Sequence, residues 1–136
     1  MTAVRHDGID AMLADARSRL DRIDAEAAHR ETVDGALLVD IRPAEQRAVE
    51  GEVDDGLRPL VVERNVLEWR LDPRSDACLP EASYDARILV LCQEGYTSSL
   101  AADALRSLGL DATDVVGGFK AWREAGLPVA ARERTA

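Results

Sequence analysis

The strongest constraint on the fold lies in one stretch, where an apolar run ends in a cysteine and a polar loop leads into a helix. No polar residue interrupts Ile88 to Leu91, which is typical of a strand buried on both faces in a parallel α/β sheet. Cys92 stands at its carboxyl end. From Ser98 to Leu108 the apolar residues recur at helical spacing, and Gly109 favours a helix end. This order of strand, cysteine, loop and helix predicts a functional site.

The position of Cys92 predicts its chemistry. In open α/β sheets, ligands bind beyond the carboxyl ends of the strands, where helix N-termini offer unpaired N–H groups. Such N–H groups favour the thiolate over the thiol, and the thiolate is the nucleophilic form. The competing interpretation is a buried structural cysteine, because free cysteine is among the most buried residue types. The pattern alone leaves both open.

Other apolar runs predict the rest of the sheet. Residues 36–41 read as a central parallel strand, 60–62 as a short edge strand and 112–116 as the last strand. Helical patterns lie between them, so we expect a single parallel α/β sheet with helices on both faces. Flavodoxin-like and thioredoxin-like arrangements satisfy the same pattern, although the chain has no Cys-x-x-Cys pair, which weakens the second.

Two charged residues stand at the end of the strand at 36–41. An aspartate within an apolar strand needs hydrogen bonds or a cation to remain ionised, and Arg42 lies two positions after Asp40. We therefore expect the two side chains to pair. A structural ion pair and a substrate contact are both compatible with this spacing.

The whole chain, residues 1–136, is predicted to form one domain. In its first 23 residues, apolar side chains recur every three or four positions, which predicts an amphipathic helix that docks on the body. Trp69 is predicted to seal the core, with a place in the pocket lining as the alternative. Phe119 and Trp122 are predicted to share an inward helix face. Residues 130–136 are expected to be frayed.

Charge and cysteine content limit the partners. With 17 Lys and Arg against 26 Asp and Glu, the net charge is −9, so no nucleic-acid partner is expected. The apolar runs fall far short of the ~20 residues that cross a bilayer, and the first residues lack the apolar segment of a signal peptide, so a cytoplasmic location is expected. The two cysteines and two histidines form no metal-ligand pattern. No metal or other cofactor is expected, no role is assigned to Cys78, and the sequence does not give the oligomeric state.

Several motifs together resemble the rhodanese (sulfurtransferase) family. Cys92-Gln-Glu-Gly-Tyr-Thr-Ser98 resembles its active-site loop, and Val39-Asp-Ile-Arg42 resembles its Val-Asp-x-Arg strand end. Gly51-Glu-Val53 resembles its Gly-His-Ile signature, with Glu52 in place of the histidine. Residues 116–129 resemble its carboxyl-terminal Gly-Gly-aromatic-x-x-Trp element. The motifs follow the family's order and spacing.

The resemblance implies a single-domain, rhodanese-like doubly wound fold and a sulfurtransferase. Cys92 would carry sulfane sulfur as a persulfide from a small-molecule or protein persulfide donor to an acceptor. Asp40 and Arg42 would shape the pocket. The loop residues that would bind the substrate and hold the persulfide are Gln93, Glu94, Gly95, Tyr96, Thr97 and Ser98.

Two departures from the family pattern bear on the donor. Thr97 stands where many rhodaneses have the arginine that binds the donor's sulfonate, and Glu94 adds a negative charge beside it. Thiosulfate is a dianion, so low thiosulfate activity is expected, and a neutral or protein-bound persulfide is the favoured donor.

Two other functions remain as alternatives. Rhodanese-like domains also serve as non-catalytic binding or regulatory modules, but inactive copies commonly lose the cysteine that is kept here. Cysteine-dependent phosphatases and arsenate reductases of related fold use a loop longer by one residue and an arginine within it. Only four residues separate Cys92 from Thr97, and no arginine occurs between Cys92 and Leu105.

Overall fold

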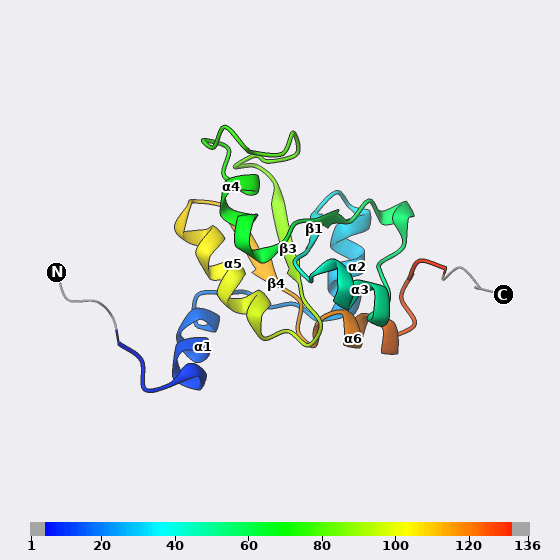
Figure 1. Cartoon of the computed structure of the whole chain (residues 1–136), viewed down its shortest axis with the longest axis horizontal. Coiled ribbons are helices and arrows are strands. Elements are labelled where there is room, and N and C mark those ends of the chain that lie inside the picture. Colours follow the sequence, from blue (N-terminus) through cyan, green and yellow to red (C-terminus); the bar gives the residue numbers. More distant parts are fainter. Residues whose placement is uncertain (1–4, 132–136) are drawn as a thin grey trace.

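The computed structural model describes residues 5–131, and its centre is a sheet of four parallel strands (Figure 1). The strands are β1 (Leu37–Asp40), β2 (Leu60–Val61), β3 (Arg87–Leu91) and β4 (Asp111–Asp114), in the order β2-β1-β3-β4. All three neighbouring pairs are parallel. The predicted α/β fold with a central parallel sheet is confirmed, and each strand lies within one or two residues of its predicted position.

Helices connect the strands. They are α1 (Ile9–Arg17), α2 (Ala25–Val33), α3 (Ala44–Glu50), α4 (Leu67–Leu71), α5 (Thr97–Ser107) and α6 (Gly118–Glu124), with single 3₁₀ turns at Asp55–Leu57 (η1) and Arg64–Val66 (η2). Asp24 caps α2, since its carboxylate accepts a hydrogen bond from the N–H of Ala27 at 2.8 Å. Among residues 5–131, no helix has the length and apolar character of a membrane span.

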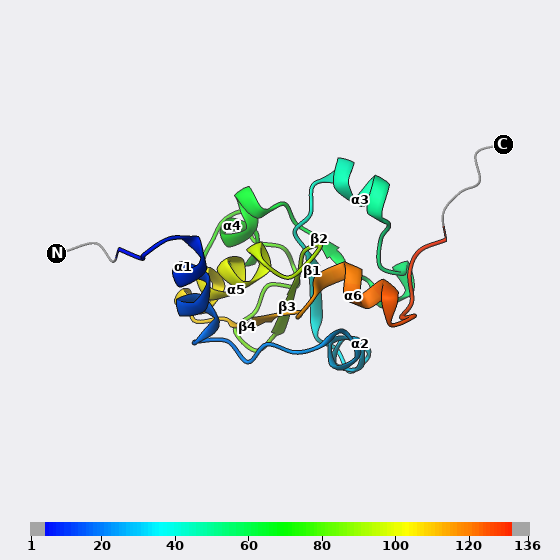
Figure 2. The same ribbon diagram turned by 90° about the horizontal axis from the view of Figure 1, so that it is seen from below.

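Helices cover both faces of the sheet, as a doubly wound fold requires (Figure 2). Because strand side chains alternate between faces, Ile88 and Val90 of β3 pack toward α4 and α5, whereas Leu89 and Leu91 pack toward α2 and α6. All four side chains are fully buried. β3 is therefore apolar on both faces, which accounts for its uninterrupted run of aliphatic residues.

The aromatic residues divide into buried and exposed positions. Phe119 and Trp122 are both 0% exposed, which confirms that they pack inward. The prediction that Trp69 seals the core is wrong, because its side chain is 61% exposed. Leu67 and Leu71, four positions apart on α4, are the residues that face the core. Trp69 lies two positions from each and therefore points away from the sheet.

The N-terminal segment packs beside α5 through helix α1 (Figure 1). Leu13 and Ala16 form its buried face, whereas Ile9 and Met12 remain exposed. The chain then passes along the edge of the sheet, where Ile23 bridges Val115 in parallel. Residues 1–4 of the predicted docking segment lie outside the described residues.

The carboxyl-terminal segment is described as far as residue 131. Val129 bridges Val53, and the N–H of Ala130 donates a hydrogen bond to the carbonyl of Glu52 at 2.8 Å. Most of the tail predicted to be frayed, residues 132–136, lies outside the described part of the chain.

Candidate active site

The carboxyl ends of the two central strands meet at one point of the sheet. Asp40 of β1 is in register with Leu91 of β3, and the N–H of Ile41 donates to the carbonyl of Leu91 at 3.0 Å. From β1 the strand order continues to β2 on one side and to β3 and β4 on the other. This is a topological switch point, where open α/β sheets bind ligands. Arg42 and Cys92 are thereby placed side by side.

A cavity of about 270 Å³ opens at this point. It is lined by Ile41, Arg42, Pro43, Gln46, Cys92, Gln93, Glu94, Tyr96 and Thr97. The structure therefore brings together most of the site residues predicted from the sequence. Asp40, Gly95 and Ser98 do not line the cavity but lie behind lining residues. Cys92 is only 5% exposed, so its sulfur is sheltered from bulk water.

A backbone N–H group points at the sulfur, as the sequence predicted. The N–H of Gly95 lies 3.2 Å from Cys92 Sγ. Gly95 has φ +85°, a conformation that glycine adopts without strain, and a Cβ there would lie 2.8 Å from the nitrogen of Gly117. The loop can turn back onto its own cysteine because this position is glycine.

Helix α6 holds the beginning of the loop. The N–H of Phe119 donates to the carbonyl of Cys92 at 2.8 Å, and that of Lys120 donates to the carbonyl of Gln93 at 3.0 Å. Gly118, at φ +61°, makes this approach possible, because a Cβ there would lie 2.3 Å from the carbonyl oxygen of Cys92. The second glycine of the Gly-Gly turn thus has a packing role against the active-site loop.

The predicted pair of Asp40 and Arg42 is present and buried. Their side chains are 3% and 1% exposed, and Arg42 Nη2 lies 2.7 Å from Asp40 Oδ2. The guanidinium also lies 4.2 Å from the ring centre of Phe119, within cation–π range. Burial by itself would lower the pKa of Arg42, but its hydrogen bonds to Asp40 and Glu50 outweigh burial and raise that pKa. Arg42 is therefore a permanent cation.

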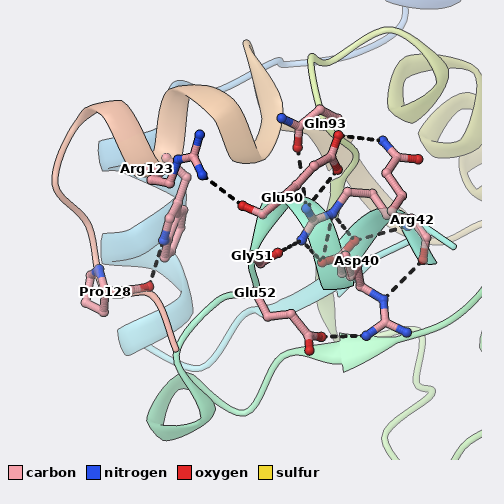
Figure 3. Close-up of polar contacts among 11 residues, drawn as sticks. Asp40, Arg42, Glu50, Gly51, Glu52, Gln93, Arg123 and Pro128 are labelled. Atoms are coloured by element: carbon pink, nitrogen blue, oxygen red, sulfur yellow. Dashed lines mark hydrogen bonds and ion pairs between the residues drawn. The ribbon is translucent and has the colours of Figure 1, made fainter. Parts of the chain in front are cut away.

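All five N–H donors of the Arg42 guanidinium already have acceptors within the protein (Figure 3). Nε donates to Asp40 at 3.0 Å, and Nη2 to Asp40 at 2.7 Å and to the Gly51 carbonyl at 2.9 Å. Nη1 donates to Glu50 at 3.2 Å and to the Gln93 side chain at 3.4 Å. Arg42 can therefore shape the cavity wall, but it has no unoccupied donor with which to grip an anion.

Glu94 is less isolated than the sequence suggested. Its side chain is 56% exposed, and one carboxylate oxygen lies 4.0 Å from Lys120 Nζ on α6. The negative charge at the cavity mouth is thus both solvated and partly compensated. Sequence reasoning missed Lys120 because it lies 26 residues after Glu94, and only the docking of α6 brings the two together.

Ser98 belongs to a buried hydrogen-bond network behind the active-site loop. Its hydroxyl and that of Ser99 donate to Oδ2 of Asp114, at 2.7 and 2.8 Å. Asp114 is 0% exposed and also accepts two hydrogen bonds from Arg22, at 2.9 and 3.2 Å. Sequence reasoning missed this network. The available signal was an aspartate at the end of the last strand, a position that needs partners in the same way as Asp40.

The histidines and the second cysteine lie elsewhere. His6 contacts Asp15 at 3.2 Å, and the ring of His29 packs edge-on against Trp122 at 5.6 Å. Neither lines the Cys92 cavity, so the structure does not form a Cys–His dyad there. Cys78 is a half-buried free thiol in the loop between α4 and β3, and it does not line the cavity either.

Comparison with known proteins defines the class to which this fold and site belong. The family model of the rhodanese-like domain matches residues 12–125, so the chain belongs to the rhodanese-like family. Among its curated relatives, the adenylyltransferase and sulfurtransferase MOCS3-2 of Zea mays is 36% identical over 87 residues, which cover 63% of this chain and 17% of the relative. MOCS3-1 of Zea mays is equally similar, and 18% of it is covered. The chain therefore spans less than a fifth of the length of these relatives.

Solved structures show the same fold. A protein of unknown function from Rhodopseudomonas palustris, described as a possible tyrosine phosphatase, has a TM-score of 0.81 and 30% identity, covering 95% of this chain and 98% of its own. A rhodanese-related protein from Thermoplasma volcanium has a TM-score of 0.61 and 26% identity, with 79% and 95% covered. The polysulfide-sulfur transferase homodimer of Wolinella succinogenes has a TM-score of 0.75 and 20% identity, with 93% and 90% covered. At that identity the last similarity concerns the fold alone.

Proposed function

We propose that this protein is a sulfurtransferase that carries sulfane sulfur as a persulfide on Cys92. The observation that carries the proposal is the position of Cys92 at the switch point of the sheet, in a cavity, with the N–H of Gly95 3.2 Å from its sulfur. An N–H donor at this distance stabilises a sulfur anion, whether thiolate or persulfide. The sulfurtransferase names of the Zea mays relatives agree with this activity.

The reaction divides into two displacements at sulfur. The Cys92 thiolate attacks the outer sulfur of a donor R–S–S⁻, the new S–S bond forms as the donor's bond breaks, and R–S⁻ departs with the electron pair. A thiophilic acceptor then attacks the outer sulfur of Cys92–S–S⁻, and the Cys92 thiolate is the leaving group. Neither step requires a proton transfer, so the absence of histidine from the cavity lining is compatible with this chemistry.

The likeness to a possible tyrosine phosphatase raises phosphoryl transfer as the alternative. Binding a phosphoryl dianion calls for cationic or N–H donors that are free to converge on its oxygens. Arg42 is the only cationic residue that lines the described cavity, and its five donors are occupied. These observations favour sulfur transfer.

A non-catalytic binding module is disfavoured because it would not need a sheltered cysteine with an N–H group directed at its sulfur.

The proposal is tested by loading the protein with sulfur. After incubation with an organic persulfide, intact-protein mass spectrometry is expected to show one added, cyanide-labile sulfur atom. Peptide mapping should place it on Cys92, and Cys92→Ser should gain none, since a serine hydroxyl forms no persulfide. Loading of Cys78 alone, or equal loading of Cys92→Ser and the parent, would reject the proposal.

The donor is proposed to be a persulfide of a small molecule or of a partner protein, and thiosulfate a poor substitute. Thr97 is exposed at the cavity wall, so an arginine there would fit without being buried and would supply a free planar fork of donors. Thr97→Arg is expected to raise thiosulfate turnover by roughly tenfold, the scale of one charge-assisted hydrogen bond, and added salt should reduce the gain. Thr97→Met is the matched control, with a long side chain and no charge. Efficient thiosulfate turnover by the parent, with no response to Thr97→Arg, would show that the missing arginine does not determine the donor.

A further inference from the structure

Two arginines from the N-terminal segment hold one carbonyl of the active-site loop. Arg17 Nη2 donates to the carbonyl oxygen of Gly95 at 2.7 Å, and Arg22 Nη2 donates to the same oxygen at 2.9 Å. Gly95 is thus fixed at both ends, because its N–H points at Cys92 Sγ and its carbonyl at two guanidinium groups. Neither arginine lines the cavity, so both contact the loop from behind.

The hydrogen bonds to the Gly95 carbonyl also fix the orientation of the peptide group that follows it. The described peptides include no cis bond, and in a trans peptide the C=O and the N–H point in opposite directions. With its carbonyl held by the arginines, the peptide between Gly95 and Tyr96 directs the N–H of Tyr96 away from them. If that carbonyl turned into the cavity instead, its negative end would oppose an anion on Cys92.

The two guanidinium groups differ in whether a nearby carboxylate compensates their positive charge. Arg22 forms an ion pair with the buried Asp114, whose charge offsets its own. Arg17 has no carboxylate partner within residues 5–131. Its Nε donates to Ser99 Oγ at 3.0 Å, and its guanidinium lies 5.7 Å from the ring centre of Tyr96. Arg17 thus adds a net positive charge behind a loop that has threonine at position 97.

We infer that Arg17 and Arg22 are positioning residues for Cys92: they hold the Gly95 carbonyl away from the cavity, so that the loop presents the N–H of Gly95, not a carbonyl, to the sulfur anion. Arg17 also supplies from helix α1 a cation that the loop itself lacks. The inference rests on the proposed function for its catalytic consequence. It gives the N-terminal segment a function beyond the packing that its amphipathic pattern predicts.

The test measures the reactivity of the sulfur directly. In the full chain carrying Cys78→Ser, the rate constant for alkylation of Cys92 by iodoacetamide at neutral pH is compared among variants of equal thermal stability. Arg17→Gln is expected to slow alkylation on the order of tenfold, because it removes charged hydrogen bonds to the loop. Arg17→Lys keeps the charge and one donor and should restore part of the rate. Arg22→Lys, which keeps a cation beside Asp114, should also be slower than the parent.

The matched control is Arg19→Gln. Arg19 joins the same segment to α5 through Asp103, at 2.7 Å, but has no hydrogen bond to the active-site loop among the described residues. Its loss should change the rate by less than about twofold, as for an exposed ion pair. An Arg19→Gln variant as slow as Arg17→Gln would show that docking, not the loop contact, sets the rate, and would overturn the inference. Unchanged alkylation in both Arg17→Gln and Arg22→Lys would overturn it as well.

Sulfur loading separates this inference from the proposed function. In a protein that loads sulfur, Arg17→Gln is expected to lower kcat with little change in KM, because Arg17 does not line the cavity. A parent that takes up no sulfur, but whose alkylation still depends on Arg17, would refute sulfur transfer and support the positioning role. A parent that loads sulfur as fast as its Arg17→Gln variant would refute the positioning role alone.

Discussion

Replacement of Asp40 by asparagine is expected to lower the free energy of unfolding by about 3 kcal/mol, because it leaves a buried guanidinium without its main counter-charge. Arg42 is 1% exposed and Asp40 3%, so water cannot take the place of the lost carboxylate. Asparagine keeps the size of the side chain but is neutral. Only its oxygen can accept hydrogen bonds from Arg42, whereas both carboxylate oxygens of Asp40 do so. Glu50 remains 3.2 Å from Arg42, which holds the loss near the lower end of the ~3–5 kcal/mol typical of a broken buried ion pair.

Urea denaturation at neutral pH measures this loss, with Asp103→Asn as the matched control. Asp103 pairs with Arg19 at 2.7 Å, but the side chains are 21% and 48% exposed. Its replacement is expected to cost less than about 1 kcal/mol, as is usual for a solvated pair. Equal effects of the two substitutions would mean that Glu50 alone compensates Arg42.

Replacement of Cys92 by serine is expected to lower the rate of sulfur transfer by at least about a thousandfold, which is the scale of removing a catalytic nucleophile. The serine side chain has nearly the same shape, so the loop and the hydrogen bonds of Phe119 and Lys120 to its carbonyls should persist. Steady-state transfer from an organic persulfide to cyanide measures the rate, and thermal unfolding confirms that the variant is folded.

Cys78→Ser is the matched control for that substitution. Cys78 is the other free thiol of the described chain, it is half-buried in a loop, and it does not line the cavity. Its replacement should leave transfer unchanged. A large loss in Cys78→Ser would require a second sulfur to take part, and would contradict a mechanism that depends on Cys92 alone.

The sequence predicted those parts of the site that depend on local patterns. The aliphatic run before Cys92, the polar residues after it and the apolar face of the following helix were sufficient to predict a strand, a loop and a helix. The pairing of Asp40 with Arg42 was equally predictable, because a charge within an apolar strand needs a nearby partner.

Features that depend on the packing of distant segments were not predictable. Arg17 and Gly95 are 78 positions apart, and their contact exists only because α1 packs beside α5. Trp69 was predicted to seal the core, but the rotation of α4 puts Leu67 and Leu71 there instead. Periodicity over one helical turn and a half is too short to fix which side faces the sheet.

Transfer of a labelled sulfur atom tests the central claim most directly. The protein is loaded from a persulfide that carries a heavy isotope in its outer sulfur, the donor is removed, and cyanide is added as acceptor. We predict that the label is found on Cys92 after loading, and that it then leaves Cys92 and appears in thiocyanate in a ratio of one to one. Label that is absent from Cys92 after loading, or that stays in the protein when thiocyanate forms, would contradict a persulfide carried by Cys92.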